Sequence, residues 1–245
     1  MAFADRVLNL PDVGFVAVAR LGHPCRLGEH AGSFDMIRIL IADDHDVVRS
    51  GLRHIVEAQP NWQIVAEAGD GKEAVQKALE TKPDVAVIAY SLPLINGVDA
   101  TRQIRSAEPR TEVLIFTMHE NETLVQESLK AGARGYLLKT DAQHQLIGAI
   151  EALAAHKPFF TAKVSEALLD SFLLSPARER SALTYRERGG VQLVAEGYTN
   201  KQIAGLLNIG LTTVETHRAR AMHKLNLSTT AQLVRYAIRN QIVEP

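Results

Sequence analysis

Acidic, hydroxyl and ammonium side chains stand at or just past the ends of apolar runs in the first 140 residues. Asp43 and Asp44 follow one run, Thr117 ends another, and Lys139 follows a third. Carboxylate oxygens suit Mg²⁺, while an ammonium and a hydroxyl can contact phosphate oxygens. The run between them ends in Ala89, whose methyl group can do neither.

The spacing of the apolar runs predicts the elements that would gather these side chains. Adjacent aspartates alone are as typical of helix caps or solvated loops as of a metal site. The set of residues at successive strand ends is therefore stronger evidence than the pair. The apolar runs end near Ala42, Ala68, Ala89, Thr117 and Leu138. A helical pattern follows each, over about 46–59, 72–81, 98–106, 121–131 and 143–155. This alternation predicts an α/β, doubly wound, five-stranded parallel sheet whose ligands bind beyond the carboxyl ends of the strands.

The last third of the chain predicts helices only. A Ser or Thr followed three residues later by Glu or Gln is typical of a helix start, because each satisfies a free backbone donor of the other. Four such pairs occur: Thr184 with Glu187, Thr199 with Gln202, Thr212 with Glu215, and Thr229 with Gln232. The short link at residues 208–211 contains a glycine and joins the second helix to the third. A small all-α helix-turn-helix domain is therefore expected.

These patterns divide the chain into four parts. Residues 1–35 show no sustained period and are expected to be a disordered extension, either a tail or the product of a misplaced start codon. The α/β domain covers 36–156. A linker with a short helix near 162–174 covers 157–182, and the helix-turn-helix domain covers 183–245.

Charge separates the two predicted domains. Residues 36–160 hold 13 Lys and Arg against 17 Asp and Glu, whereas residues 178–245 hold 10 against 5. The basic part is suited to a polyanion. The single cysteine, Cys25, allows no internal disulfide, and no run reaches the length of a membrane span. We therefore expect a cytoplasmic protein without a membrane partner.

Two stretches resemble known families. Residues 36–156 resemble the flavodoxin-like receiver domain of bacterial response regulators, through Ile41-Ala42-Asp43-Asp44-His45, Pro83-Asp84, Leu92-Pro93-Leu94-Ile95-Asn96-Gly97, Thr117 and Gly135-Tyr136-Leu137-Leu138-Lys139. Residues 183–243 resemble the helix-turn-helix domain of NarL/FixJ (LuxR/GerE-type) regulators, through Leu183-Thr184, Leu193-Val194-Ala195-Glu196-Gly197, Asn200-Lys201-Gln202-Ile203-Ala204 and Thr213-Val214-Glu215-Thr216-His217-Arg218.

The first resemblance implies a role for each residue of the acidic crevice. Asp43 and Asp44 match the metal-binding pair, Thr117 and Lys139 the phosphoryl-sensing groups, and Tyr136 the aromatic that repositions on activation. Ala89 occupies the place of the phosphoacceptor aspartate, so no catalytic residue is expected. Asp84 and Asp99 lie too far along the chain to replace it, and the hydroxyls of Tyr90 and Ser91 offer no carboxylate.

The missing carboxylate has electrostatic consequences. One fewer anion relieves repulsion in a metal-free site and weakens Mg²⁺ binding. We expect Lys139 to turn to Asp44 and the domain to keep one conformation.

The second resemblance implies double-stranded DNA as partner. The third helix of the tail, about residues 212–225, is expected in the major groove, and the last, about 231–242, in a homodimer contact. Thr213, Val214, His217 and Arg218 are the candidates for base contacts, and Lys201, Arg220 and Lys224 for phosphate contacts. Thr212 stands where the family usually has lysine, and Gly189-Gly190 where it has bulkier residues, so weaker DNA binding is expected.

Three functions fit these features. The first is a transcription regulator of the response-regulator class that works without phosphorylation. The second is an ordinary phosphorelay regulator, served by a sensor kinase, with an acceptor-to-alanine substitution. The third is a protein-interaction module that titrates a sister regulator without binding DNA. An enzyme is not expected.

Overall fold

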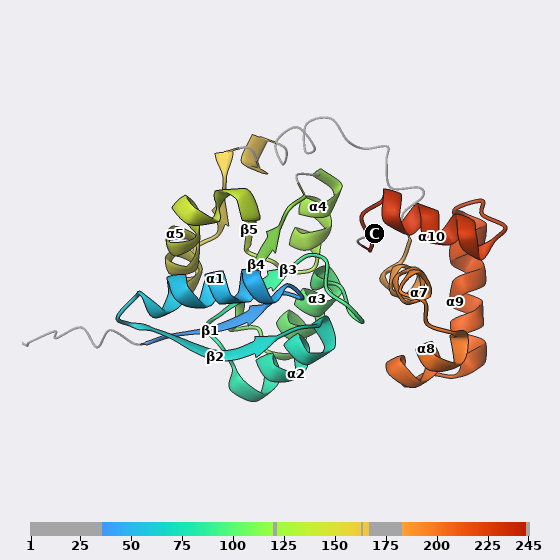
Figure 1. Cartoon of the computed structure of the whole chain (residues 1–245), viewed down its shortest axis with the longest axis horizontal. Coiled ribbons are helices and arrows are strands. Elements are labelled where there is room, and N and C mark those ends of the chain that lie inside the picture. The colour runs from blue at the N-terminus through green and yellow to red at the C-terminus, as the bar shows by residue number, and fades with distance from the viewer. Residues whose placement is uncertain (1–35, 120–121, 163, 167–182, 244–245) are drawn as a thin grey trace, which may run out of the picture. The chain divides into compact units, whose positions relative to one another are not determined.

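The computed structural model describes residues 36–119, 122–162, 164–166 and 183–243. Strands and helices alternate in the first part, and only helices are found in the last range (Figure 1). The strands are β1 Ile37–Ala42, β2 Trp62–Ala68, β3 Val85–Ala89, β4 Glu112–Thr117, β5 Gly135–Leu138 and β6 Phe159–Phe160. The helices are α1 Asp46–Glu57, α2 Gly71–Thr81, α3 Gly97–Ala107, α4 Glu122–Lys130, α5 Ala142–Ala154, α7 Tyr185–Ala195, α8 Asn200–Leu207, α9 Leu211–Lys224 and α10 Thr230–Arg239.

The strands form one parallel sheet in the order β2-β1-β3-β4-β5-β6. The predicted α/β class with a doubly wound parallel sheet is confirmed. The predicted number of strands is wrong, because β6 adds a sixth beside β5, with Phe159 opposite Gly135 and Phe160 opposite Tyr136. The edge of β5 would otherwise leave its backbone groups unpaired, and both phenylalanine rings pack against the core there.

Alternate strand residues point to opposite faces of the sheet, and each face is covered by helices. Leu52 and Val56 of α1 and four apolar residues of α5 pack on the face that carries Ile39 and Ile41. Helices α2, α3 and α4 cover the other face, which carries Leu40 and Ile88. Burial on both faces explains why the strands are continuous apolar runs rather than alternating ones.

Three helices of the helical part begin with a capping box. Thr184, Thr199 and Thr229 each cap a helix and form the reciprocal bond with the Glu or Gln three residues later. Three of the four predicted capping pairs are therefore confirmed. The helices share a core of their own that includes Leu193, Ile203 and Leu233.

The fourth capping pair is wrong. Helix α9 begins at Leu211 with Gly210 as its N-cap, and no side chain caps it. The carbonyl of Gly210 already accepts the backbone N–H of Val214 at 3.2 Å, so Thr212 lies inside the first turn. Its carbonyl accepts the hydroxyl of Thr216 at 2.8 Å. The carboxylate of Glu215 is consequently left out of the helix start.

Gly190 lies inside α7, where replacing glycine by alanine is expected to increase the stability of the protein. A β-carbon at Gly190 would meet no heavy atom within 4 Å. Gly190→Ala is expected to stabilise the protein by about 1 kcal/mol, because alanine loses less backbone entropy in a helix interior. Urea unfolding would measure the change.

Gly97 is the matched control for this substitution. A β-carbon at Gly97 would lie 2.1 Å from the carbonyl oxygen of Ala89. Gly97→Ala should therefore destabilise the protein, although it also replaces a helical glycine. A loss of stability in Gly190→Ala would contradict the prediction.

Some sequence predictions fall outside the described ranges. These are the extension at 1–35 and most of the predicted helix at 162–174. In the described part of the chain, no helix combines the length and apolar character needed to cross a membrane.

Candidate functional site

The carboxyl ends of β1, β3, β4 and β5 bring together the acidic crevice predicted from the sequence. Asp43 follows β1, Ala89 ends β3, Thr117 ends β4, and Lys139 follows β5. These strands are neighbours in the sheet, so their ends meet at one edge. Ala89 is almost completely buried. The third strand therefore contributes a methyl group to this corner.

Lys139 binds Asp43, not Asp44 as the sequence led us to expect. The lysine Nζ lies 2.6 Å from Asp43 Oδ2, and the aspartate side chain is fully buried. A buried carboxylate needs a partner far more than an exposed one does. Asp44 is about one-third exposed and is close to the imidazole of His45, at 2.9 Å.

Among the residues that the structure describes, the acidic pair and His45 form the cluster that could hold a metal ion. One ligand atom from each of Asp43, Asp44 and His45 lies within 4.8 Å of the others. The negative charge of Asp44 raises the pKa of the His45 imidazole, and only the neutral form of the ring can bind a metal ion. Two carboxylates fit a hard cation such as Mg²⁺. Because β3 ends in Ala89, it supplies a methyl group to this site and no third carboxylate.

Thr117 and Tyr136 are both fixed through the backbone of His119. The hydroxyl oxygen of Thr117 accepts the His119 N–H at 3.1 Å. Tyr136 is 1% exposed, and its hydroxyl donates to the His119 carbonyl at 2.8 Å. The two side chains matched to a switch therefore lie inward and share one anchoring residue.

The hydroxyl of Tyr90, next to Ala89, is also engaged. It accepts a hydrogen bond from the guanidinium of Arg188 on α7. Burial raises the pKa of the Tyr90 phenol well above its usual range, so the group stays neutral. The phenol thus serves a contact with the helical part and is not an anionic ligand.

Helix α9 does not fully expose most of the residues proposed as base contacts. Val214 is 3% exposed and packs in the core of the helical part, so its assignment to a base contact is wrong. Arg218 is tied down, with hydrogen bonds to Asn200 Oδ1 at 3.1 Å and Thr230 Oγ1 at 2.6 Å. His217 is half-buried beside them. Only Thr213 of the four is exposed.

The proposed phosphate contacts also differ among themselves. Lys201 and Arg220 are exposed. Lys224 is paired, with its Nζ 2.7 Å from Glu187 Oε2. Burial acts to raise the pKa of Glu187, but the hydrogen bonds from Lys224 and Thr184 outweigh it and the pKa is lowered. Lys224 therefore links α9 to α7.

The outward face of α9 carries residues that the sequence reading missed. With Val214 and Ala221 buried, the helical period turns the opposite side to solvent. That side exposes Thr212, Glu215, Thr216 and Ala219, which were not predicted to contact DNA, together with Arg220, which was. The buried pair seven residues apart was the signal that could have set this phase.

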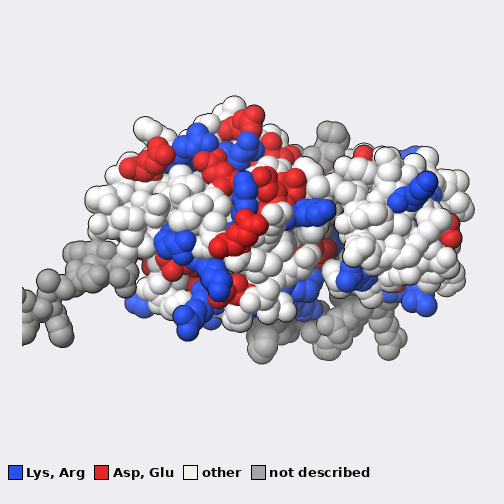
Figure 2. Space-filling model, turned by 90° about the horizontal axis from the view of Figure 1, so that it is seen from below, with Lys and Arg blue, Asp and Glu red and all other residues white. Residues whose placement is uncertain are grey.

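Charge on the surface follows the same division as the sequence. Figure 2 shows most of the acidic side chains of this face over the α/β part, interspersed with lysines and arginines, whereas the visible face of the helical part is largely uncharged with scattered lysines and arginines.

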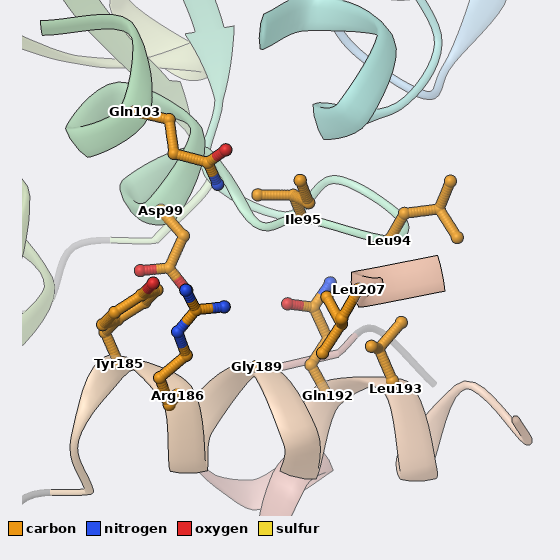
Figure 3. Close-up of a pocket in the computed structure, with 10 residues that line it drawn as sticks. All are labelled: Leu94, Ile95, Asp99, Gln103, Tyr185, Arg186, Gly189, Gln192, Leu193 and Leu207. Carbon is orange, nitrogen blue, oxygen red and sulfur yellow. The ribbon is translucent and has the colours of Figure 1, made fainter. Parts of the chain in front are cut away.

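Helix α7 contacts the loop that follows Ala89. A cavity of about 50 Å³ lies beside this contact, lined by Leu94 and Ile95 of the loop, by Asp99 and Gln103 of α3, by Leu207 of α8, and by α7. Figure 3 shows Gln192 rising from α7 toward the loop that carries Leu94 and Ile95. Its amide nitrogen donates to the Leu92 carbonyl at 2.8 Å.

Two family models match this chain. Residues 39–151 match the response regulator receiver domain, and residues 181–237 match the bacterial regulatory proteins of the luxR family. The oxygen regulatory protein NreC of Staphylococcus epidermidis is 38% identical over 217 residues, which cover 85% of this chain and 100% of that protein.

Solved structures give the same picture. A LuxR-family two-component response regulator from Aurantimonas is 36% identical with a TM-score of 0.53, over 56% of this chain and 97% of that one. A structure of two RcsB dimers bound to two parallel DNAs is 26% identical with a TM-score of 0.51, over 82% of this chain and 96% of that one.

Proposed function

Because the chain belongs to the response regulators that join a receiver domain to a LuxR-family helix-turn-helix, we propose that it controls transcription without taking up a phosphoryl group. It is a DNA-binding transcription regulator and not an enzyme. One observation carries the proposal: the end of β3 holds Ala89. The pairing of Lys139 with Asp43 supports it.

The corner lacks the group that would accept a phosphoryl. The carboxylates of Asp84 and Asp99, before and after this position in the sequence, are hydrogen-bonded to other groups. Asp84 Oδ2 accepts the backbone N–H of Arg38 at the opposite end of β3. Asp99 accepts hydrogen bonds from Asn96 and Arg102 at the start of α3. These partners support a receiver whose state does not depend on phosphorylation.

We further propose that Asp43 and Asp44 bind Mg²⁺ weakly. Their oxygens would hold the ion, which would supply positive charge to the corner. Lys139 already neutralises Asp43, so the ion must compete with an ammonium at 2.6 Å. The ion then stabilises the crevice without being required for DNA binding.

The DNA-reading surface is assigned to the outward face of α9. A recognition helix enters the major groove with its exposed N-terminal residues against the base edges. Thr212, Glu215 and Thr216 are exposed there, with Arg220 on the flank to contact phosphate. The Glu215 carboxylate is exposed on α9 and has no hydrogen-bond or ion-pair partner within the described ranges. A free carboxylate on this face would be repelled by phosphates unless it accepts from the amino group of cytosine.

The helical part also supports a homodimer through α10. Leu233 and Ala237 point into the core of the domain, whereas Ile238 remains 38% exposed. The RcsB relative binds DNA as dimers. A dimer would place two α9 helices on two half-sites about one helical turn apart.

Selection of bound fragments from a random DNA pool tests the proposed function. The full chain, never exposed to a phosphoryl donor, should enrich one short motif, and binding should weaken with rising salt. Loss of enrichment unless a phosphoryl donor is added would contradict phosphorylation independence. Enrichment of nothing under either condition would favour the module that binds only proteins.

Glu215→Gln is expected to change the base read at one motif position from cytosine to adenine. A glutamine amide donates and accepts, as adenine requires, whereas a carboxylate only accepts. Affinity for the original motif should fall roughly tenfold, within the ~1–3 kcal/mol typical of one base contact. Repeating the selection with the variant measures both effects.

Arg220→Ala is the matched control. It should weaken binding to all sequences alike and reduce the salt dependence by about one charge. A motif that is the same for Glu215→Gln and the native chain would remove Glu215 from the reading face.

A further inference from the structure

Three polar side chains stand four residues apart on one face of α7 and at its C-cap. They are Arg188, Gln192 and Glu196. Each contacts a different residue of the loop that runs from Tyr90 to Asn96. Spacing of four residues puts side chains in one row on a helix, so the row and the loop face each other along their length.

Gln192 is the centre of this contact. It is 1% exposed, and its amide nitrogen donates to the Leu92 carbonyl at 2.8 Å. Its amide oxygen accepts from Asn96 Nδ2 at 3.0 Å. A buried amide with both ends satisfied fixes the register between loop and helix.

Glu196 and Leu94 form one end of the contact. Glu196 Oε2 accepts the backbone N–H of Leu94 at 3.3 Å, and its other oxygen accepts from Gln192 at 2.7 Å. Leu94 has a φ of +66° and packs against the core of the helical part. A leucine in the left-handed region is strained. The strained backbone thus presents both a donor and an apolar side chain to the helix-turn-helix domain.

Arg188 forms the other end. Its guanidinium bonds the carboxylate of Glu127 on α4 and the hydroxyl of Tyr90, and its carbon lies 5.8 Å from the centre of the Tyr90 ring. A largely buried cation needs such a carboxylate. The residue next to the vacant acceptor position is therefore joined directly to the DNA-binding domain.

The recognition face stays exposed while this contact is formed. Thr212, Glu215, Thr216 and Arg220 are all exposed in the same structure in which Gln192 is buried. The row on α7 and the outward face of α9 belong to different helices, so one surface can be occupied without covering the other.

We infer that the loop of residues 90–96 is a permanent dock for α7, and that the docked protein is the form that binds DNA. The receiver then acts as a fixed support that holds the helix-turn-helix domain with α9 free, instead of a gate that must release it. This inference rests on the proposed DNA-binding function and adds the arrangement in which it operates.

Bridging the two sides of the dock tests the inference. In a Cys25→Ser background, which removes the only native cysteine, Asn96→Cys and Gln192→Cys would be joined by a short, cleavable bifunctional thiol reagent. We expect rapid bridging and a DNA affinity within about twofold of that of the unbridged variant. Mobility shift on the selected motif, before and after cleavage by reductant, gives the comparison.

The controls separate failure of the dock from failure of DNA binding. Each single cysteine variant controls for the reagent, and Asn96→Cys with Arg239→Cys is the unmatched pair, since Arg239 is exposed at the end of α10. A tenfold or greater loss of affinity that reductant restores would overturn the inference. Bridging no faster than in the unmatched pair would also overturn it. Absence of DNA binding before bridging would instead overturn the proposed function.

Discussion

Ala89→Asp is expected to take up one phosphoryl group from acetyl phosphate in the presence of Mg²⁺, whereas the native chain takes up none. The substitution places a carboxylate at the end of β3, between the ends of β1 and β4. Asp43, Asp44, Thr117 and Lys139 already line that corner. If the proposed function is right, the variant supplies the acceptor that the corner needs, and intact-protein mass spectrometry would detect its phosphorylation.

The same variant should depend on Mg²⁺ for stability. Two carboxylates ~4 Å apart repel by about 4 kcal/mol at an effective dielectric of 20, before any relaxation. Asp43 is fully buried, so the added charge cannot be relieved by solvent at that side chain. Thermal unfolding should therefore show a lower midpoint than in the native chain, and Mg²⁺ should restore part of it.

Ala89→Asn is the matched control, because it has nearly the shape of aspartate without the charge. It should remain unphosphorylated and should respond to Mg²⁺ no more than the native chain does. Phosphorylation of the native chain at a rate similar to that of Ala89→Asp would mean that another residue accepts the group. In that event the proposed independence from phosphorylation would be wrong.

The receiver fold could be predicted because its signals are local and repeated. Each apolar run ends where a strand ends, and the five helical patterns correspond to α1 through α5 within a few residues. The sheet edge then follows from topology, since parallel strands bring their carboxyl ends together. That is why Asp43, Ala89 and Lys139 could be placed at one corner from the sequence alone.

The sixth strand gave no comparable signal. Two residues, Phe159 and Phe160, are too short to show a period. Their pairing depends on the free edge of β5, which exists only once the sheet is assembled. The partner of Lys139 was missed for a related reason. Burial, not sequence position, decides that Asp43 attracts the ammonium more strongly than Asp44.

The start of α9 was mispredicted by a local rule that usually works, the spacing of a Thr and a Glu three residues apart. Thr212 and Glu215 have the spacing of a capping pair, but Gly210 starts the helix first. The position of the start does not change which side chains face inward. Val214 was proposed as a base contact from the family resemblance, and its burial shows that it lies on the inward side. The contact of α7 with residues 90–96 could not be predicted at all, because about one hundred residues separate the partners.

Lys139→Met is expected to destabilise the protein by about 3 kcal/mol, because removing one partner of a buried ion pair leaves the other charge without compensation. The lysine side chain is 15% exposed and its partner, Asp43, is fully buried. Methionine keeps most of the apolar stem, so little of the effect would come from lost packing. Urea unfolding, with the slope checked for constancy, gives the free energy.

The double variant Lys139→Met with Asp43→Asn decides whether charge is the cause. Asparagine removes the buried negative charge and retains an oxygen that can accept the His45 N–H, which Asp43 Oδ1 accepts at 3.0 Å. We expect the double variant to be more stable than Lys139→Met alone, because the uncompensated anion is gone. Equal stability of the two would show that Lys139 contributes through packing. The corner would then not be held in one state by its ion pair, and the physical basis for a receiver fixed without phosphorylation would be lost.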